Sequence, residues 1–205
     1  MRRAEPFGSS AIPLVRMPFA AESTLPLVQA ARQHDTHAWN RLLKQHERAL
    51  FVYIADIIGN ETAALDLIQE TLANAVRYIG GLKDDAKFTP WLFGIAHQKC
   101  VQYWRSQRRD ETVFAKTEEE LGPEAEAVEG NNPFTLLVRH EQEATFLTCL
   151  DRLPESQRAV ILLRLLEDFS LQEISDITGS PLGTVKSRLH HAIRALRASL
   201  TLNPS

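Results

Sequence analysis

The side chains with the clearest chemical potential lie in one short run near the C-terminus. Thr184, Lys186, Ser187 and Arg188 place two hydroxyls and two cations in the first turns of a predicted helix, and His191 follows on the same face. Hydroxyls and cations of this kind form hydrogen bonds with base edges and phosphates. An ordinary amphipathic helix with a solvated charged face would show the same spacing, so the pattern alone leaves both readings open.

A helix-turn-helix would position these side chains. Ser170-Leu171-Gln172-Glu173 fits the capping-box pattern that begins a helix, and Gly179 is predicted to end that short helix. Ser180-Pro181 is then predicted to cap a longer basic helix, the one that enters the major groove in such motifs. The residues of this second helix that are predicted to face inward are Leu182, Val185, Leu189, Ile193, Leu196 and Leu200.

The net charge of −3 conceals an uneven distribution of charge along the 205 residues. Residues 110–133 hold eight acids and one lysine, a net charge of −7, which leaves +4 for the rest of the chain. His97–Arg109 and Pro181–Leu200 each carry four lysines or arginines and no acid. The overall charge therefore hides two basic faces, as expected of a nucleic-acid-binding protein.

The apolar spacing predicts helices in the N-terminal half. One long helix is predicted from Thr24 to about Gly59, where Gly59-Asn60 is a stop signal. The next is predicted from about Thr62 to Ile79, with Val76 among its inward-facing residues. A third is predicted over 89–109, with Thr89 as its N-cap.

Four helices are predicted in the C-terminal part: 136–151, 154–166 and the two helices of the helix-turn-helix. The predicted fold class is therefore all-α, with two small helical domains joined by a flexible acidic linker, the second containing the helix-turn-helix. The predicted divisions are a flexible tail at 1–22, a first domain at 23–109, the linker at 110–134 and a second domain at 135–201.

Several classes of protein are disfavoured by the composition. The two cysteines, Cys100 and Cys149, are far apart, which argues against a disulfide framework and favours the cytoplasm. No apolar run of about 18 residues is present, so no membrane insertion is expected. With no metal-ligand spacing, phosphate-binding glycine loop or nucleophile motif, we expect no enzyme activity, no cofactor and no metal site.

Three C-terminal segments closely resemble the fourth domain of extracytoplasmic-function (ECF) sigma factors, which reads the minus-thirty-five promoter element. They are Leu153–Arg158 (LPESQR), Leu171–Ser175 (LQEIS) and Gly183–Leu189 (GTVKSRL). LuxR-type regulators share a similar helix-turn-helix, so this half of the chain is compatible with two families.

Two N-terminal segments resemble the ECF sigma factors alone. Asp66–Leu72 (DLIQETL) is similar to the family's D-L-V-Q-E-x-F segment, which binds the clamp helices of the largest polymerase subunit. Phe88–Ala96 (FTPWLFGIA) is similar to the stretch where the helix and its preceding loop melt and read the minus-ten element. LuxR-type regulators lack this half. The chain is thus identified as a member of the ECF group of the sigma-70 family over about residues 25–109 and 136–200.

The resemblance implies a sigma factor that directs promoter recognition and transcription initiation at a specialised, stress- or signal-responsive regulon. Its implied partners are bacterial core RNA polymerase and promoter DNA. The residues implied for core polymerase binding are Asp66, Leu67, Gln69, Glu70 and Leu72. Those implied for the minus-ten element are Trp91, Gln98, Lys99, Arg105, Arg108 and Arg109. Those implied for the minus-thirty-five element are Thr184, Lys186, Ser187, Arg188 and His191.

The helix predicted to read the minus-ten element has the residue types that this task needs. Unpaired bases are captured by stacking on aromatic rings, and the strand's backbone follows cationic side chains. Trp91, Tyr103 and Trp104 lie near Lys99 and the three arginines of this helix. The alternative for Trp91 is a place in the core.

This chain departs from the family pattern at two points. The family's I-A-R-N is Ile95–Gln98 (IAHQ) here, so its promoter sequence is not carried over. The family's acidic cluster D-A-E-D is Ala63–Asp66 (AALD) here, so two of three acids are missing. Interfacial charges set on-rate and register, so fewer acids predict weak intrinsic binding to core polymerase.

Thr62 adjoins the missing acids at the predicted start of a helix. A phosphate there would add a charge of about −1.5 to −2, and a helix N-terminus favours an anion. We therefore hypothesise that a Ser/Thr kinase activates the protein by phosphorylating Thr62. The alternative is that Thr62 serves only as an N-cap.

Two further alternatives concern regulation and function. An anti-sigma factor that masks both domains is the family's commonest control, and no sequence feature excludes it. A free-standing, dimeric helix-turn-helix repressor would bind duplex DNA tightly without polymerase and would not need a polymerase-binding segment. Our expectation is a monomer.

Overall fold

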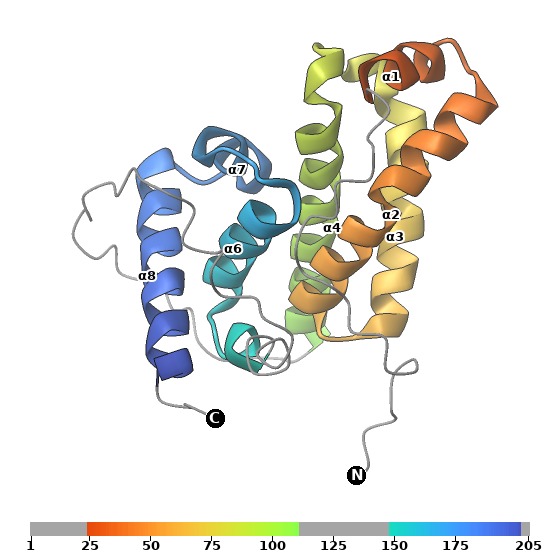
Figure 1. The fold of residues 1–205 in the computed structure, drawn as a ribbon. Helices are drawn as coiled ribbons and strands as arrows, with labels where there is room; N and C mark the ends of the chain where they lie inside the picture. The colour runs from red at the N-terminus through yellow and green to blue at the C-terminus, as the bar shows by residue number, and fades with distance from the viewer. Residues whose placement is uncertain (1–23, 111–147, 202–205) are drawn as a thin grey trace.

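The computed structural model describes residues 24–110 and 148–201, where every regular element is a helix (Figure 1). The predicted all-α class is therefore confirmed for these residues. The predicted tail, residues 111–134 of the predicted linker and residues 136–147 of a predicted helix lie outside them. No helix in the described ranges is long and apolar enough to cross a bilayer. The elements, with η for 3₁₀ helices, are α1 (Thr24–Arg32), α2 (Thr36–Ile58), α3 (Glu61–Tyr78), η1 (Ile79–Gly81), η2 (Asp85–Lys87), α4 (Phe88–Asp110), α6 (Glu155–Glu167), α7 (Leu171–Thr178) and α8 (Leu182–Thr201).

The prediction of one long helix from Thr24 to Gly59 is wrong, because the chain turns between α1 and α2. His34 has a φ of 64°, a left-handed conformation in which histidine is enriched among non-glycine residues. Asp35 then caps α2, with its carboxylate accepting hydrogen bonds from the backbone N–H groups of His37 and Ala38. The aspartate starts a new helix at a point where the apolar pattern continues without a break.

Gly59 and Asn60 separate α2 from α3, as predicted. Gly59 has a φ of 67°, the conformation that glycine adopts without strain, and its N–H donates to the carbonyl of Ala55. The side chain of Asn60 caps α3 by accepting from the N–H of Ala63 at 3.1 Å. Thr62 is consequently the second residue of the helix and does not cap it.

Helix α4 begins at Phe88, so the prediction of Thr89 as its N-cap is wrong. The 3₁₀ turn η2 leads directly into α4, and Thr89 lies inside the first turn. Its hydroxyl bonds with Nε2 of His46 on α2 at 3.0 Å. Pro90 is tolerated in this first turn because the first N–H groups of a helix have no intrahelical partner.

Helices α1 to α4 share one core, in which aromatic residues of α2 and α4 lie among aliphatic side chains. Phe88 and Phe93 of α4 and Tyr53 of α2 are fully buried. The hydroxyl of Tyr53 shares a hydrogen bond of 2.8 Å with Nδ1 of His97. Cys100 is buried in the same core, and this burial raises the pKa of its thiol to about 12.

Helices α6, α7 and α8 form the second unit, in which residues 148–151 are also helical. α6 packs against α8, and α7 packs against both. The buried faces of these three helices meet in a core made mainly of aliphatic side chains. Its fully buried residues include Leu150, Ile161, Leu162, Leu163, Ile174 and Val185.

The two units pack directly against each other (Figure 1). α7 lies against α4, and α6 lies against α2. Phe169, in the loop between α6 and α7, is buried and meets Phe93 edge to face, with ring centroids 5.3 Å apart. Residues more than 70 positions apart in the chain thus share one apolar contact.

Substitution of His97 by glutamine should remove a pH-dependent part of the stability. Burial, with a smaller effect of Arg188, lowers the pKa of His97 from 6.5 to about 4. The unfolded chain therefore binds a proton that the folded chain does not, so the free energy of unfolding falls as pH falls below 6.5.

For wild type, we expect this residue alone to cost about 2 kcal/mol at pH 5 relative to pH 7.5. Urea unfolding of wild type and His97→Gln at both pH values isolates its share, because other titrating groups are common to both proteins. Equal pH dependence in the two proteins would contradict the assignment.

Candidate nucleic-acid interface

The turn between α7 and α8 holds the predicted helix-turn-helix together. The capping box at the start of α7 is confirmed: the Ser170 hydroxyl accepts from the N–H of Glu173, and the Glu173 carboxylate accepts from the N–H of Ser170. Gly179 ends α7 with a φ of 64°. The hydroxyl of Ser175 then donates to the carbonyl of Ser180 at 2.7 Å, which fixes the path of the turn.

The start of α8 differs in detail from the prediction. The carbonyl of Pro181 accepts the first bond of the helix, from Val185, and α8 begins at Leu182. The hydroxyl of Ser180 accepts a bond of 2.9 Å from the Arg188 guanidinium. Leu182, predicted to face inward, is 36% exposed because it precedes the buried face that starts at Val185.

The five residues predicted to contact the minus-thirty-five element all lie in the first ten residues of α8. Thr184, Lys186, Ser187 and Arg188 are half-buried, and His191 is exposed. Since the Arg188 guanidinium already bonds Ser180, it braces the turn from within the same motif. The side chains of this group are thus presented by a fixed helix end.

The residues predicted for the minus-ten element lie along α4 in three different settings. Trp91 is half-buried against Phe88, with ring centroids 5.9 Å apart, whereas Gln98 and Arg105 are exposed. Lys99 forms an ion pair of 2.7 Å with Glu70 of α3. The side chains of Arg108 and Arg109 lie outside the described part of the chain.

The residues predicted to bind polymerase lie on α3, mainly on its outer face. Asp66, Gln69 and Glu70 are exposed, and Leu72 is half-buried. Leu67 is buried and supports the helix from inside.

The outer face of α3 also carries apolar residues. Val76 was predicted to face inward, but it is 47% exposed. Leu65, at a position where the family has an acid, is 53% exposed. Leu65, Leu72 and Val76 recur at helical spacing and form an apolar strip on this face, in which Leu65 stands where the family pattern has an acid. The position of Leu65 outside the predicted inward-facing stripe was the available signal in the sequence.

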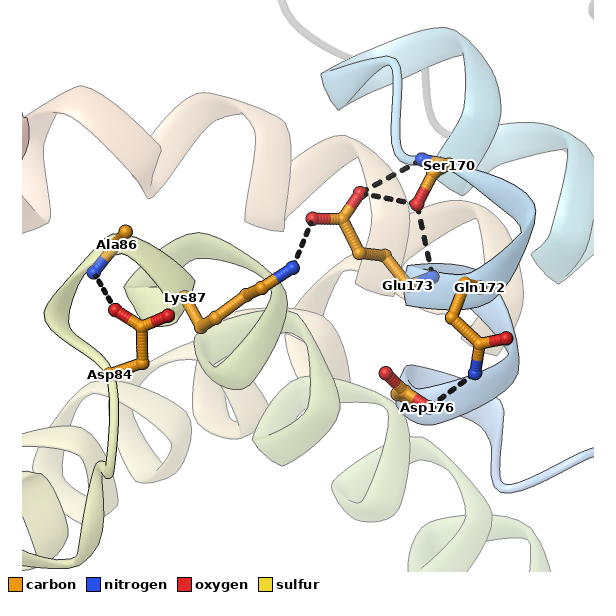
Figure 2. A network of polar contacts seen from close by, with 7 residues as sticks. All are labelled: Asp84, Ala86, Lys87, Ser170, Gln172, Glu173 and Asp176. Carbon is orange, nitrogen blue, oxygen red and sulfur yellow. Dashed lines mark hydrogen bonds and ion pairs between the residues drawn. The ribbon is translucent and has the colours of Figure 1, made fainter.

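A polar network joins the two units, and sequence reasoning missed it (Figure 2). The Lys87 ammonium lies 3.3 Å from the Glu173 carboxylate, which simultaneously accepts from the N–H and hydroxyl of Ser170. Burial acts to raise the pKa of Glu173, but the hydrogen bonds from Ser170 and Lys87 outweigh it and lower the pKa below its usual value. Glu173 therefore serves both the capping box and the contact with the other unit.

A second polar contact between the units is made by Arg158 of α6. Its guanidinium donates to the backbone carbonyl of Asp56 at 3.1 Å and lies 3.7 Å from the Asp56 carboxylate. It also donates to the carbonyls of Asp151 and Leu153. Burial raises the pKa of Asp56 to about 6 although Arg158 acts to lower it, so the pair is charged at neutral pH.

A cleft of about 540 Å³ lies between α4 and α7. Trp91 and Gln98 line one wall, and Glu173 and Asp176 line the other. Lys83 and Lys87 also border it. The cleft thus brings residues predicted to read DNA next to the carboxylates of the first helix of the helix-turn-helix. Among residues 24–110 and 148–201, no cluster of His, Cys, Asp and Glu side chains is suited to hold a metal ion.

Comparison with protein families gives two matches, one in each unit. The family described as sigma-70 region 2 matches residues 42–110, and the family described as sigma-70, region 4, matches residues 144–196. These matches cover α3 and α4 in the first unit and the helix-turn-helix in the second.

Curated relatives match most of the chain. The RNA polymerase sigma-H factor of Pseudomonas aeruginosa is 27% identical over 182 residues, which cover 87% of this chain and 94% of that one. The RNA polymerase sigma factor SigV of Bacillus subtilis is 26% identical over 159 residues, 78% of this chain and 89% of that one.

Two solved structures share the fold. CnrH, in complex with the cytosolic domain of CnrY, has a TM-score of 0.62 at 21% identity and covers 88% of this chain and 99% of its own. The sigma factor RpoE of Bartonella quintana, in complex with the anti-sigma factor NepR, has a TM-score of 0.59 at 24% identity. That match covers 80% of this chain and 98% of its own.

The two glycines of the helix-turn-helix should respond in opposite directions to alanine. Gly179→Ala should destabilise the protein by about 1–2 kcal/mol, because a side chain is strained at a φ of 64°. Gly183 lies inside α8, where a Cβ meets no atom within 4 Å, so Gly183→Ala should stabilise by about 0.5–1 kcal/mol. Urea unfolding of both variants checks the pair; a destabilising Gly183→Ala would contradict the backbone geometry.

Proposed function

This chain belongs to the sigma-70 family as an ECF sigma factor for promoter recognition by RNA polymerase, and from that premise we propose how its residues divide the work. Sigma factors assist initiation, while the polymerase performs the bond chemistry. We assign core binding and minus-ten melting to residues 23–109 and minus-thirty-five recognition to residues 135–201, with 1–22 as a tail and 110–134 as the connection. The presence of both region matches in one chain carries this proposal and disfavours a free-standing repressor.

The start of α8 reads the minus-thirty-five element in this proposal. Thr184 and Ser187 supply hydroxyls, Lys186 and Arg188 supply cations, and His191 continues the same helix. Their position in the first turns of the second helix of the motif supports the assignment, because these turns reach base edges in the major groove. Lys186 makes a phosphate contact, since an ammonium acts as a point charge toward phosphate.

Helix α4 opens and reads the minus-ten element. Trp91 supplies a stacking surface, Gln98 pairs with base edges, and a cationic track follows the strand's backbone. The exposure of Gln98 and Arg105 supports this role. The cationic residues of the track are Lys99, Arg105, Arg108 and Arg109.

The outer face of α3 binds core polymerase. Asp66, Gln69 and Glu70 supply the polar contacts, Leu72 adds a half-buried apolar one, and Leu67 fixes the helix from the core. Their exposure on a single helix face supports the assignment. The protein acts as a cytoplasmic monomer at a specialised regulon, where polymerase is shared with other sigma factors.

Phosphorylation of Thr62 strengthens polymerase binding. Thr62 is exposed in the first turn of α3, so a kinase can reach it, and an anion there is favoured by the helix dipole. It lies one turn before Leu65 and Asp66, where this chain lacks acids. A phosphate would therefore return negative charge to the face that binds the clamp.

Control by an anti-sigma factor is the alternative regulation. Both solved structures reported above are complexes with a second protein, and in one of them the sigma factor RpoE is bound to the anti-sigma factor NepR. The two mechanisms differ in where the inhibition resides. If a kinase is the switch, the purified, unmodified protein binds core polymerase weakly. If an anti-sigma factor is the control, the purified protein binds core polymerase tightly, because the inhibitor is absent.

Thr62→Glu should therefore bind core RNA polymerase more tightly than wild type, by at least about five-fold, or about 1 kcal/mol. Thr36→Glu is the matched control, because Thr36 is an exposed threonine in the first turn of α2, away from the proposed contact face. Fluorescence anisotropy of labelled protein against core polymerase measures both. Strong binding by unmodified wild type, or Thr62 found unmodified by mass spectrometry in cells transcribing the target genes, would exclude the kinase switch.

Lys186→Ala should weaken holoenzyme binding to promoter DNA at every sequence to a similar extent. Loss of one phosphate contact should reduce the slope of log affinity against log salt by about 1. The measurement uses promoters that wild-type holoenzyme selects from a random-sequence library. Lys44→Ala, which removes an exposed cation from α2 in the other unit, is the charge-matched control and should leave the slope unchanged. An unchanged slope in Lys186→Ala would contradict the phosphate contact.

A further inference from the structure

The hydroxyl of Thr89, at the start of α4, bonds to a different helix and not back along its own. A threonine inside a helix ordinarily donates to a backbone carbonyl three or four residues earlier. Thr71 and Thr178 do so, each to the carbonyl four residues earlier. Thr89 instead bonds Nε2 of His46 on α2, 43 positions earlier in the chain, at 3.0 Å. This bond therefore ties the first turn of α4 to a neighbouring helix.

The surroundings of His46 fix the direction of this hydrogen bond. The side chain is buried, and its Nδ1 lies 2.8 Å from the carbonyl oxygen of Leu42, an atom that can only accept, so Nδ1 carries the proton. Burial lowers the pKa of His46, and the bond to Leu42 only partly offsets this effect, so the ring is neutral at pH 7. Nε2 is then left as an acceptor, and the Thr89 hydroxyl donates to it.

Aromatic contacts continue from His46 to the residue proposed to stack with an unpaired base. The His46 ring meets Phe88 edge to face, with ring centroids 5.6 Å apart. The centroid of the Phe88 ring lies 5.9 Å from that of Trp91. Phe88 is fully buried and Trp91 is half-buried, so Phe88 supports from the core a ring that reaches solvent. His46 thus contacts two consecutive residues, Phe88 and Thr89, in the turn that presents Trp91.

We propose that His46 is a positioning residue for promoter opening. Through Thr89 and Phe88 it fixes the first turn of α4, and thereby the direction of the Trp91 ring. A base stacks best on a ring that is already held in one orientation, because ordering a side chain at the moment of binding costs conformational entropy. This inference rests on the proposed function, in which Trp91 supplies the stacking surface. It adds a residue of α2, a helix to which the proposed function gives no contact with DNA.

Two variants of Thr89 separate its hydrogen bond from the volume of its side chain. Thr89→Val keeps the shape without the hydroxyl, whereas Thr89→Ser keeps the hydroxyl. Thr71→Val is the matched control, because it also removes a buried hydroxyl bond from the first unit, on a helix other than α4. Each variant is assembled with core polymerase, and the rate of open-complex formation is measured on promoters that wild-type holoenzyme selects from a random-sequence library. Affinity for core polymerase is measured beside it.

Thr89→Val should form open complexes at least about five-fold more slowly than wild type, because part of a stacking contact is lost. Thr89→Ser and Thr71→Val should open at rates close to that of wild type, and all three variants should bind core polymerase as wild type does. A normal rate in Thr89→Val, or equal slowing in either of the other two variants, would overturn the inference alone. Failure of wild type to bind core polymerase or to select any promoter would remove the proposed function, and this inference with it.

A double-mutant cycle tests whether Thr89 acts through His46. His46→Met keeps an unbranched side chain of similar size and supplies no ring nitrogen. His46→Met should slow opening at least as much as Thr89→Val, and the double variant should be no slower than His46→Met, because both changes remove the same bond. Normal opening by His46→Met, or additive losses in the double variant, would mean that Thr89 acts by itself, as in a direct contact with DNA, and would overturn the role of His46.

Fluorine NMR of protein labelled with 5-fluorotryptophan reads the surroundings of the Trp91 ring directly. The chain has three tryptophans, and substitution of each by tyrosine assigns its resonance. Thr89→Val should shift the resonance of Trp91 and leave that of Trp104, toward the other end of α4, in place. Thr71→Val should shift neither. An unchanged Trp91 resonance in Thr89→Val would overturn the positioning role, whatever the rate of opening.

Discussion

The burial of Phe93 is the constraint on which the rest of this structure depends. Its ring centroid lies 5.7 Å from that of Tyr53 on α2 and 5.3 Å from that of Phe169 in the second unit. The first contact fixes α4 within the four-helix unit, and therefore fixes the direction in which Trp91 and Gln98 point. The second contact brings α7 onto the same helix. One side chain thus links the packing of α4 in the first unit to the position of the second unit.

Several charged side chains of this protein form ion pairs between helices or between units, and the net charge of the chain does not indicate these pairs. Lys99 of α4 pairs with Glu70 of α3, which joins a residue assigned to DNA with one assigned to polymerase. Lys87, in the 3₁₀ turn η2 that leads into α4, and Glu173 of α7 make the corresponding link between the two units. Each pair is partly exposed, so each holds its partner weakly enough to exchange it for a phosphate or a protein group.

Local signals predicted the elements well, whereas contacts between distant residues could not be predicted. The capping box at Ser170 and the helix end at Gly59 each depend on a few adjacent residues, so both could be predicted from the sequence. The break at His34 was missed because no glycine or proline marks it and the apolar spacing continues. Thr89 was misassigned because its partner, His46, lies on another helix. The contact of Phe93 with Phe169 depends on how two units meet, which no periodicity encodes.

Cys100 lies one turn beyond His97 in the core of the first unit, where burial raises the pKa of its thiol to about 12. Only the thiolate reacts readily with peroxides and disulfides, and at cellular pH this sulfur remains protonated. Oxidants that reach the cell therefore find no reactive sulfur at this position. An oxidant signal would therefore not be sensed through Cys100, and helix α4, which carries this cysteine, would keep its chemistry intact under the same stress.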